Sequence, residues 1–217
     1  MAAPHVAGIM ALIKKKHPTW SPAAIQSAII TTAKDMDLDG KPMVDNKNGK
    51  PASIFAKGAG LVNPSGAMDP GLVYDRNISD YKGYMCGLGY SSSNVELIIR
   101  KHVNCTKVKK IKASQLNYAS IMVTLSNISP NETVQRTVTN VGDANSEYNA
   151  RVVHPVGANI TLSPDKLQFS KHNQPMSFNI TISMVAPAQV PGKISEGKLE
   201  WLSKKHVVRS PIAVIFG

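Results

Sequence analysis

Long apolar runs are missing from this sequence, and so are most aromatic residues. No hydrophobic stretch in the 217 residues approaches the roughly 20 that a membrane-spanning helix needs. Aromatic residues make up 6%, and none interleaves with the lysine cluster at 107–112 as a nucleic-acid stacking surface would require. We therefore expect neither a membrane nor a nucleic acid as a partner. The hydrophobic content of 42% indicates a folded globular protein.

Cysteine is nearly absent, with only Cys86 and Cys105 present. A disulfide between them would close a modest loop and contribute ~3 kcal/mol. We predict that their Cα atoms lie roughly 4.4–6.8 Å apart. Six Asn-x-Ser/Thr sequons are dense for this length, and with the cysteine pair they favour a secretory ancestry. The candidate glycosylation sites are Asn77, Asn104, Asn127, Asn131, Asn159 and Asn179.

An N-terminal signal peptide is not expected in these residues. Met1 to Ile13 are apolar, but no positively charged region precedes them. The charges of Lys14, Lys15 and Lys16 follow the apolar stretch, which reverses the order of a signal peptide.

The first half of the chain is predicted to be helical and rich in loops. We expect a helix over 4–16 that is apolar on every side and therefore buried, with Pro4 at its first position. Ser21 and Pro22 can begin a second helix over 23–33. Residues 35–58 indicate an exposed loop, and Gly and Pro punctuate 57–75 throughout. Two short helices are expected at Tyr81–Cys86 and Asn94–Lys101.

The pattern changes near Leu116, after which short β-branched stretches alternate with polar residues. Seven strands in about 100 residues are typical of an antiparallel sandwich of immunoglobulin or fibronectin type. The expected strands are Ser120–Leu125, Val134–Asn140, Tyr148–Val153, Ile160–Ser163, Ser177–Met184, Lys198–Leu202 and Val207–Ile215.

Several motifs resemble one protein family, in the family's order and over essentially the whole chain. The opening MAAPHVAGIMALIKKKHPTWSPAAIQSAIITTA is similar to the segment after the catalytic serine of subtilisin-like proteases. KGAGLVNP, AMDPGLVYD and YMCGLGY follow, and the last two resemble the plant branch of that family. LNYASI, RTVTNVG and KHVVRSPIAV resemble the fibronectin-like C-terminal domain of plant subtilases.

This resemblance implies an α + β chain in two parts. A helical remnant of a subtilisin-like α/β domain would be followed by an all-β, fibronectin type III-like sandwich. We place the remnant of the peptidase domain at 1–80, a helical linker with the cysteine pair at 81–115, and the sandwich at 116–217.

The resemblance also implies that the catalytic groups are not among these residues. The family's Asp, His and Ser triad and its oxyanion Asn map upstream of residue 1, and a nucleophile needs both a base and oxyanion donors. We interpret His5 as a structural residue of a buried helix start. We therefore expect a C-terminal fragment of a secreted serine endopeptidase, inactive alone. The alternative is a non-catalytic β-sandwich that serves as a binding module.

No cofactor or metal is expected. Asp35, Asp37, Asp39 and Gly40 faintly resemble a calcium-binding loop, but Asn46 stands where that loop requires Glu. No His/Cys/Asp spacing resembles a zinc site.

The remaining partners and the location follow from the resemblance and the charge. In the parent family we expect the rest of the peptidase domain and peptide substrates as partners, and an extracellular, apoplastic location. The net charge of +11 fits a solvated basic surface or weak contact with acidic cell-wall polysaccharides, and charge alone does not decide between them.

Overall fold

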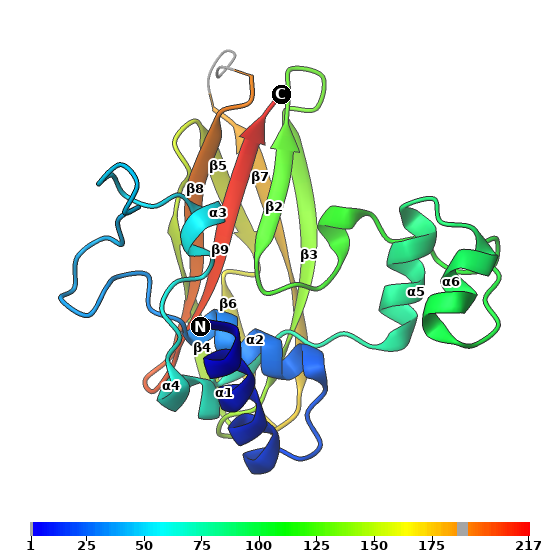
Figure 1. Cartoon of the computed structure of the whole chain (residues 1–217), viewed down its shortest axis with the longest axis horizontal. Coiled ribbons are helices and arrows are strands. Elements are labelled where there is room, and N and C mark those ends of the chain that lie inside the picture. The colour runs from blue at the N-terminus through cyan, green and yellow to red at the C-terminus, as the bar shows by residue number, and fades with distance from the viewer. Residues whose placement is uncertain (1, 186–190) are drawn as a thin grey trace.

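The computed structural model describes residues 2–185 and 191–217. It confirms the expected fold class: a helical, loop-rich first part followed by two packed sheets (Figure 1). No helix within the described residues is both long and apolar enough to cross a membrane.

Two helices open the chain, α1 (Ala2–Lys16) and α2 (Pro22–Thr32). Helix α1 already includes Ala2, so Pro4 lies within its first turn rather than at its first position. Ser21 caps α2 by accepting a hydrogen bond from the Ala24 amide at 2.9 Å, and Pro22 occupies the first helical position, where its missing N–H costs nothing.

The segment after α2 is largely irregular, as its composition predicts, but it contains three short elements. These are α3 (Ile54–Lys57), α4 (Pro64–Met68) and β1 (Leu72–Val73). The expected loop at 35–58 therefore ends in a helical turn, and the Gly- and Pro-punctuated stretch contains a strand. Strand β1 pairs with β3 of the sandwich, so residues N-terminal to position 80 contribute to the second part of the fold.

A small helical arm connects the two parts, formed by α5 (Ile78–Gly87) and α6 (Ser92–Ile99) and followed by the 3-10 turn η1 (Ala113–Gln115). Figure 1 shows α5 and α6 projecting to the side of the sheets. Asn77 and Asp80 form a reciprocal capping box at the start of α5. Because Cys86, Val95 and Val103 form its own small buried cluster, the arm has a core separate from that of the sandwich.

The sandwich contains two sheets, ordered β1-β3-β7-β5 and β2-β9-β8-β4-β6. All seven expected strands are present, most with slightly wider bounds, and β1 and β6 are additional. The strands are β2 (Ile121–Leu125), β3 (Asn131–Asn140), β4 (Ser146–Val153), β5 (Ala158–Ser163), β6 (Lys166–Phe169), β7 (Pro175–Met184), β8 (Ile194–Leu202) and β9 (Val207–Phe216).

One pairing differs from the antiparallel expectation, because β2 and β9 run parallel, from Ile121 opposite Ile212 to Leu125 opposite Phe216. These strands begin and end the domain sequence, so no tight hairpin fixes their relative direction. The core between the sheets is aromatic at its centre, where Phe178 and Trp201 meet edge to face at 4.9 Å.

The two sheets differ in what covers their outer faces. Strand β9 is buried along nearly its whole length, because α2 and the segment before α4 lie on the five-stranded sheet. In the four-stranded sheet, β3 and β7 alternate between buried and more exposed residues. The helices of the first part therefore pack on the five-stranded sheet. The other sheet is free of them, and the segment 109–117 lines a groove along the outer side of its strand β3.

Candidate functional site

Within the described residues, five of the six histidines contact groups other than serine or cysteine side chains. His17 stacks on Trp20 with ring centroids 3.9 Å apart, and His102 pairs with Glu96 at 2.6 Å. His154, His172 and His206 contact a backbone amide, a backbone carbonyl, and Asp69 with Tyr148, respectively. None of these five rings hydrogen-bonds a serine or cysteine side chain within the described residues.

His5 lies on α1 and is exposed, which corrects the interpretation of a buried helix start. The reason is that α1 buries only Ile13, while Leu12 keeps 55% of its surface exposed. Gly8 has no atom within 4 Å of a Cβ built on it, so no other backbone approaches the helix there. Helix α1 is thus apolar on sides that no other described residue covers.

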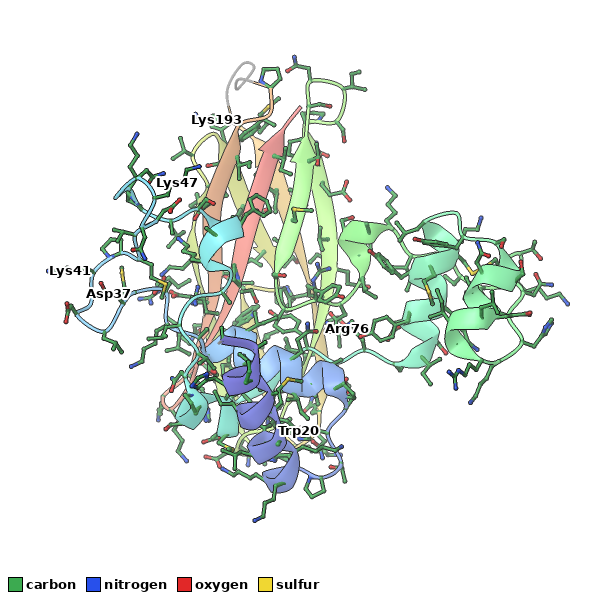
Figure 2. The ribbon with its side chains drawn as sticks, in the orientation of Figure 1. Trp20, Asp37, Lys41, Lys47, Arg76 and Lys193 are labelled. Carbon is green, nitrogen blue, oxygen red and sulfur yellow. A yellow bond between two sulfur atoms is a disulfide. The ribbon has the colours of Figure 1, made fainter. Side chains whose placement is uncertain are left out.

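An apolar groove of about 410 Å³ runs between α1, α2 and the start of α5. Its walls include Val6 and Met10 of α1, Ile29 and Ile30 of α2, and Tyr81 of α5. Together with the exposed side of α1, this groove forms the apolar face of the N-terminal helices. Figure 2 draws the side chains of these helices and labels Trp20 in the turn between them.

Buried polar contacts join the N-terminal part of the chain to the sandwich, and we call this set of contacts the junction. Tyr74 directly follows β1 and is fully buried in the core of the sandwich. Its amide donates to Ser27 Oγ at 2.8 Å, and its hydroxyl lies 2.8 Å from Ser210 Oγ of β9. Burial raises the pKa of Tyr74, so its hydroxyl stays neutral. Through its amide and its hydroxyl together, Tyr74 links α2 to β9.

Arg76 follows at the entrance to the helical arm, where Figure 2 labels it. Its guanidinium lies 4.0 Å from the centre of the Tyr118 ring and donates to the Asn117 carbonyl at 3.0 Å. It also donates to Gln26 of α2 and to the Tyr81 hydroxyl of α5. One side chain therefore ties α2, the arm and the entry to the sandwich together.

Arg136 is a second buried cation, with 2% of its surface exposed. It donates to the Tyr118 carbonyl at 3.0 Å and to the Ser114 carbonyl at 2.9 Å. Burial lowers the pKa of Arg136 to about 10, so the guanidinium remains charged at neutral pH. Its role is to satisfy backbone carbonyls where the chain enters the sandwich.

On the five-stranded sheet, Arg209 of β9 fastens the segment that follows α2. Its guanidinium donates to the Ala33 carbonyl at 2.7 Å and to the Ala59 carbonyl. Close by, Lys198 of β8 pairs with Asp35 at 2.7 Å. Burial would raise the pKa of Asp35, but the hydrogen bond from Lys198 and the charge of Arg209 hold it below its usual value.

His206 and Tyr148 meet Gly71 at the lower end of this junction. Gly71 has a φ of +77°, and a Cβ placed on it would lie 2.6 Å from both His206 Cγ and the Tyr148 hydroxyl. His206 Nε2 lies 3.1 Å from Asp69 Oδ2. Burial raises the pKa of Tyr148 to about 12. Only glycine fits this crossing of the two parts.

The predicted cysteine pair is brought together as a disulfide. Cys86 at the end of α5 and Cys105 after α6 are joined with a Cα–Cα distance of 5.3 Å, inside the predicted range. In the acidic loop, Asp37 accepts hydrogen bonds from the amides of Asp39 and Lys41 within its own turn, and Asp35 pairs with Lys198. No cluster of three metal-ligating side chains occurs in the described part of the chain.

All six sequon asparagines are exposed, on the arm or on the sandwich. By contrast, no sequence pattern predicts the residues that join the N-terminal part to the sandwich, above all Arg76, Arg136 and Arg209. Their signal was faint: each sits in or beside a motif of the resemblance, but a single arginine in a polar or alternating stretch predicts a solvated position.

Comparisons with known proteins support the two-part interpretation. The Subtilase family pattern matches residues 1–60, and the Fibronectin type-III domain pattern matches residues 115–214. A solved FixG-related protein from Vibrio parahaemolyticus overlaps with 14% identity over 40% of this chain and 78% of its own, at a TM-score of 0.33, which is too low to indicate function.

Relatives among plant proteins match nearly the whole chain. Subtilisin-like protease SBT1.7 of Arabidopsis thaliana is 40% identical over 99% of this chain, and SBT4.14 of the same plant is 42% identical over 99%. The chain spans 28% of the length of each. It therefore joins a subtilase-family segment to a fibronectin type-III domain, and along its whole length it is related to the plant subtilisin-like serine proteases.

Proposed function

We propose that these 217 residues form the C-terminal, non-catalytic part of a secreted subtilisin-like serine endopeptidase. In this role the sandwich holds α2 in place. Helix α1, which precedes α2, packs into the rest of a peptidase domain. The observation that carries the proposal is the apolar face of the N-terminal helices, where α1 buries Ile13 alone.

The energetics of α1 support this role. Burying a side chain such as Leu12 or Met10 contributes about 1.5–3 kcal/mol, so several half-exposed apolar residues forfeit an amount comparable to a domain's whole stability. Such a surface is costly in a free chain but suits a helix enclosed by other parts of a peptidase domain.

A chimaera tests this directly. The portion of subtilisin-like protease SBT1.7 that this chain matches would be replaced by the 217 residues, and peptide hydrolysis measured. We expect an active chimaera, and loss of activity when Leu12 is changed to Asp. The exposed Leu38→Asp change, which lies in the loop outside the apolar face, is the matched control. A secreted, folded chimaera that hydrolyses nothing would contradict the proposal.

The same proposal implies that the 217-residue chain alone is inactive. A fluorophosphonate probe should not label the purified chain, and a broad peptide library should remain uncut, because His17, His102, His154, His172 and His206 contact no serine or cysteine side chain in the described residues and the family's triad maps upstream of residue 1. Labelling of one serine, mapped by mass spectrometry and abolished by changing that serine to Ala, would overturn this part.

A secretory route is part of the proposal. The disulfide and the six exposed sequon asparagines support it, since disulfides persist in oxidising compartments and sequons are glycosylated in secreted proteins.

We also propose that the chain contacts acidic cell-wall polysaccharides. This contact is supported by the helical arm, residues 77–112, which holds seven Lys and Arg against two Asp and Glu. Retention on polygalacturonate that falls steeply with salt would support it, and salt-independent retention would not.

A further inference from the structure

The outer face of the four-stranded sheet carries no charge, in a chain with a net charge of +11. Its outward positions on β3, β7 and β5 are Asn, Gln, Ser or Thr, apart from Pro175 at one end of β7. We call this set the polar face. It consists of Asn131, Thr133, Gln135, Thr137, Thr139, Ser177, Asn179, Thr181, Ser183, Asn159, Thr161 and Ser163.

The strand register places three complete sequons side by side on the polar face. In one row Asn131 and Asn159 flank Ser183, and in another Asn179 lies between Gln135 and Ser163. In a strand, residues two apart point to the same side, so each sequon shows both its Asn and its hydroxyl residue to solvent.

The threonines of the three sequons form a single row between those two. Thr133, Thr181 and Thr161 are neighbours across β3, β7 and β5, and the hydroxyls of Thr133 and Thr181 lie 2.9 Å apart. These threonines therefore contact their cross-strand neighbours and occupy the part of the polar face between the two rows of asparagines.

The three asparagine side chains themselves are open to modification. Each is exposed, and none takes part in a side-chain hydrogen bond within the described residues. This differs from Asn77 and Asn104, whose side-chain oxygens accept backbone amides of Ser79 and Thr106. Strand spacing puts Asn131 and Asn159 about 10 Å apart and Asn179 about 13 Å further along, which separates the stems of three glycans.

The polar face also lacks the usual protection of a sheet edge. Strand β5 pairs only with β7, and no strand covers its other side. There the Ile160 amide donates to His154 Nδ1 and the Ala158 amide to the Pro155 carbonyl, so the edge is only partly satisfied. Proteins commonly block such an edge with lysine or another charge, and the outward residues of β5 are Asn159, Thr161 and Ser163. A bulky solvated group on Asn159 would prevent another strand from pairing there.

We propose that the polar face is a glycan-bearing face, with N-glycans on Asn131, Asn159 and Asn179. The donor is an oligosaccharide linked to a lipid through pyrophosphate. The carboxamide Nδ2 forms a bond to the anomeric carbon, the bond from that carbon to pyrophosphate breaks, pyrophosphate leaves with the electron pair, and Nδ2 loses a proton. The proposal rests on the secretory route of the proposed function.

If so, the two sheets have different roles, one in packing against protein and one in facing solvent. The five-stranded sheet, with no sequon on any of its strands, is the side that packs against protein. The glycans turn the other sheet permanently toward solvent and replace the charges that would otherwise keep it soluble.

Site mapping tests the modification. The full 217-residue chain would be produced in eukaryotic cells behind a cleavable secretory leader, and its glycans released by a peptide N-glycosidase in ¹⁸O water. We expect ¹⁸O-labelled Asp at all three positions in most molecules. A secreted chain with the Cys86–Cys105 disulfide formed but bare asparagines on this face would overturn the inference, and would leave the proposed function standing.

Matched variants test the protective role. The face variant carries Asn131→Gln, Asn159→Gln and Asn179→Gln. The control loses the other three sequons through Asn77→Ser, Asn104→Gln and Asn127→Gln, where Ser preserves the helix cap. We expect soluble monomer to fall about threefold or more for the face variant relative to the control, because its β5 edge is unprotected. Equal losses in both variants would contradict a special role for this face.

Discussion

Gly71 is the residue at which the two parts of the molecule pass closest to each other. Its positive φ suits glycine, and a methyl group there would overlap the His206 ring and the Tyr148 hydroxyl. Neither neighbour can withdraw easily, since Tyr148 is fully buried and His206 lies beside Asp69. The two parts can therefore pass this close to each other only because glycine has no side chain.

Gly71→Ala should lower the free energy of unfolding by about 2–4 kcal/mol, from backbone strain and overpacking together. Urea denaturation followed by tryptophan fluorescence measures it, because Trp201 lies in the sandwich core. Gly40→Ala is the matched control: Gly40 has a similar φ of +75° but no atom within 4 Å of its Cβ position. If both variants lose the same stability, steric fit at Gly71 is not the cause.

Asp35 makes a pH-dependent contribution to the same junction. Its pKa is lowered from 3.8 in the folded chain, because Lys198 and Arg209 outweigh the effect of burial. A carboxylate with a depressed folded pKa stabilises the fold above its unfolded pKa, and this contribution is lost as the pH falls through the folded value.

Asp35→Asn should therefore destabilise the chain at neutral pH and flatten the decline of stability below pH 3.8, the usual value of this carboxyl. Unfolding midpoints measured across that range provide the test. Asp39→Asn serves as the control, since Asp39 is exposed in the same loop and forms no ion pair within the described residues. An unchanged pH profile for Asp35→Asn would show that this ion pair does not hold the loop.

At the scale of elements, the helical arm depends on its disulfide. Its buried cluster is small, with Cys86, Val95 and Val103 at the centre. Replacing Cys86 and Cys105 by Ala should cost about 3 kcal/mol by the loop-entropy argument. Hydrogen exchange should rise in α5 and α6 and stay unchanged in β3, β7 and β9. An equal rise in those strands would mean that the arm and the sandwich unfold as one unit.

The strands were predictable because alternation is a local signal. Strand β3 reads buried and exposed in turn, and its sequence shows the same period. Strand β6 was missed because it has four residues, none of them β-branched. Strand β1 was missed because it lies between Gly71 and Tyr74 in a stretch that reads as turns, and it forms only by pairing with β3.

The junction was not predictable from the sequence, for a different reason. Arg209 meets Ala33 and Ala59 across more than 140 positions of the chain. Such contacts depend on which sheet the helices cover, and a local pattern carries no information about that. The exposure of His5 was misjudged similarly, because an apolar sequence indicates that a helix needs burial but does not supply what buries it.

The whole molecule combines a well-buried sandwich with an N-terminal helix that has little to pack against. Helix α2 is held more firmly than its neighbour, since Ala23, Ala24, Ile25 and Ala28 are buried and Ser27 bonds to Tyr74. Helix α1 rests on Ile13 and the half-buried Ile9 and Met10. Stability should therefore decline in steps from the sheets to α2 and then to α1.

Hydrogen exchange along the chain should show this order, with α1 losing protection first, α2 next and the strands of both sheets last. Two adjacent substitutions sharpen the test. Leu12→Gln should leave the unfolding midpoint nearly unchanged and reduce self-association, because Leu12 is 55% exposed. Ile13→Gln should detach α1, because Ile13 is fully buried and an unpaired amide there costs about 1–3 kcal/mol in addition to the lost apolar contact. Protection of α1 in a monomer equal to that of β7 and β9 would mean that this helix already has the packing it needs, and the apolar face would then need no peptidase domain to cover it.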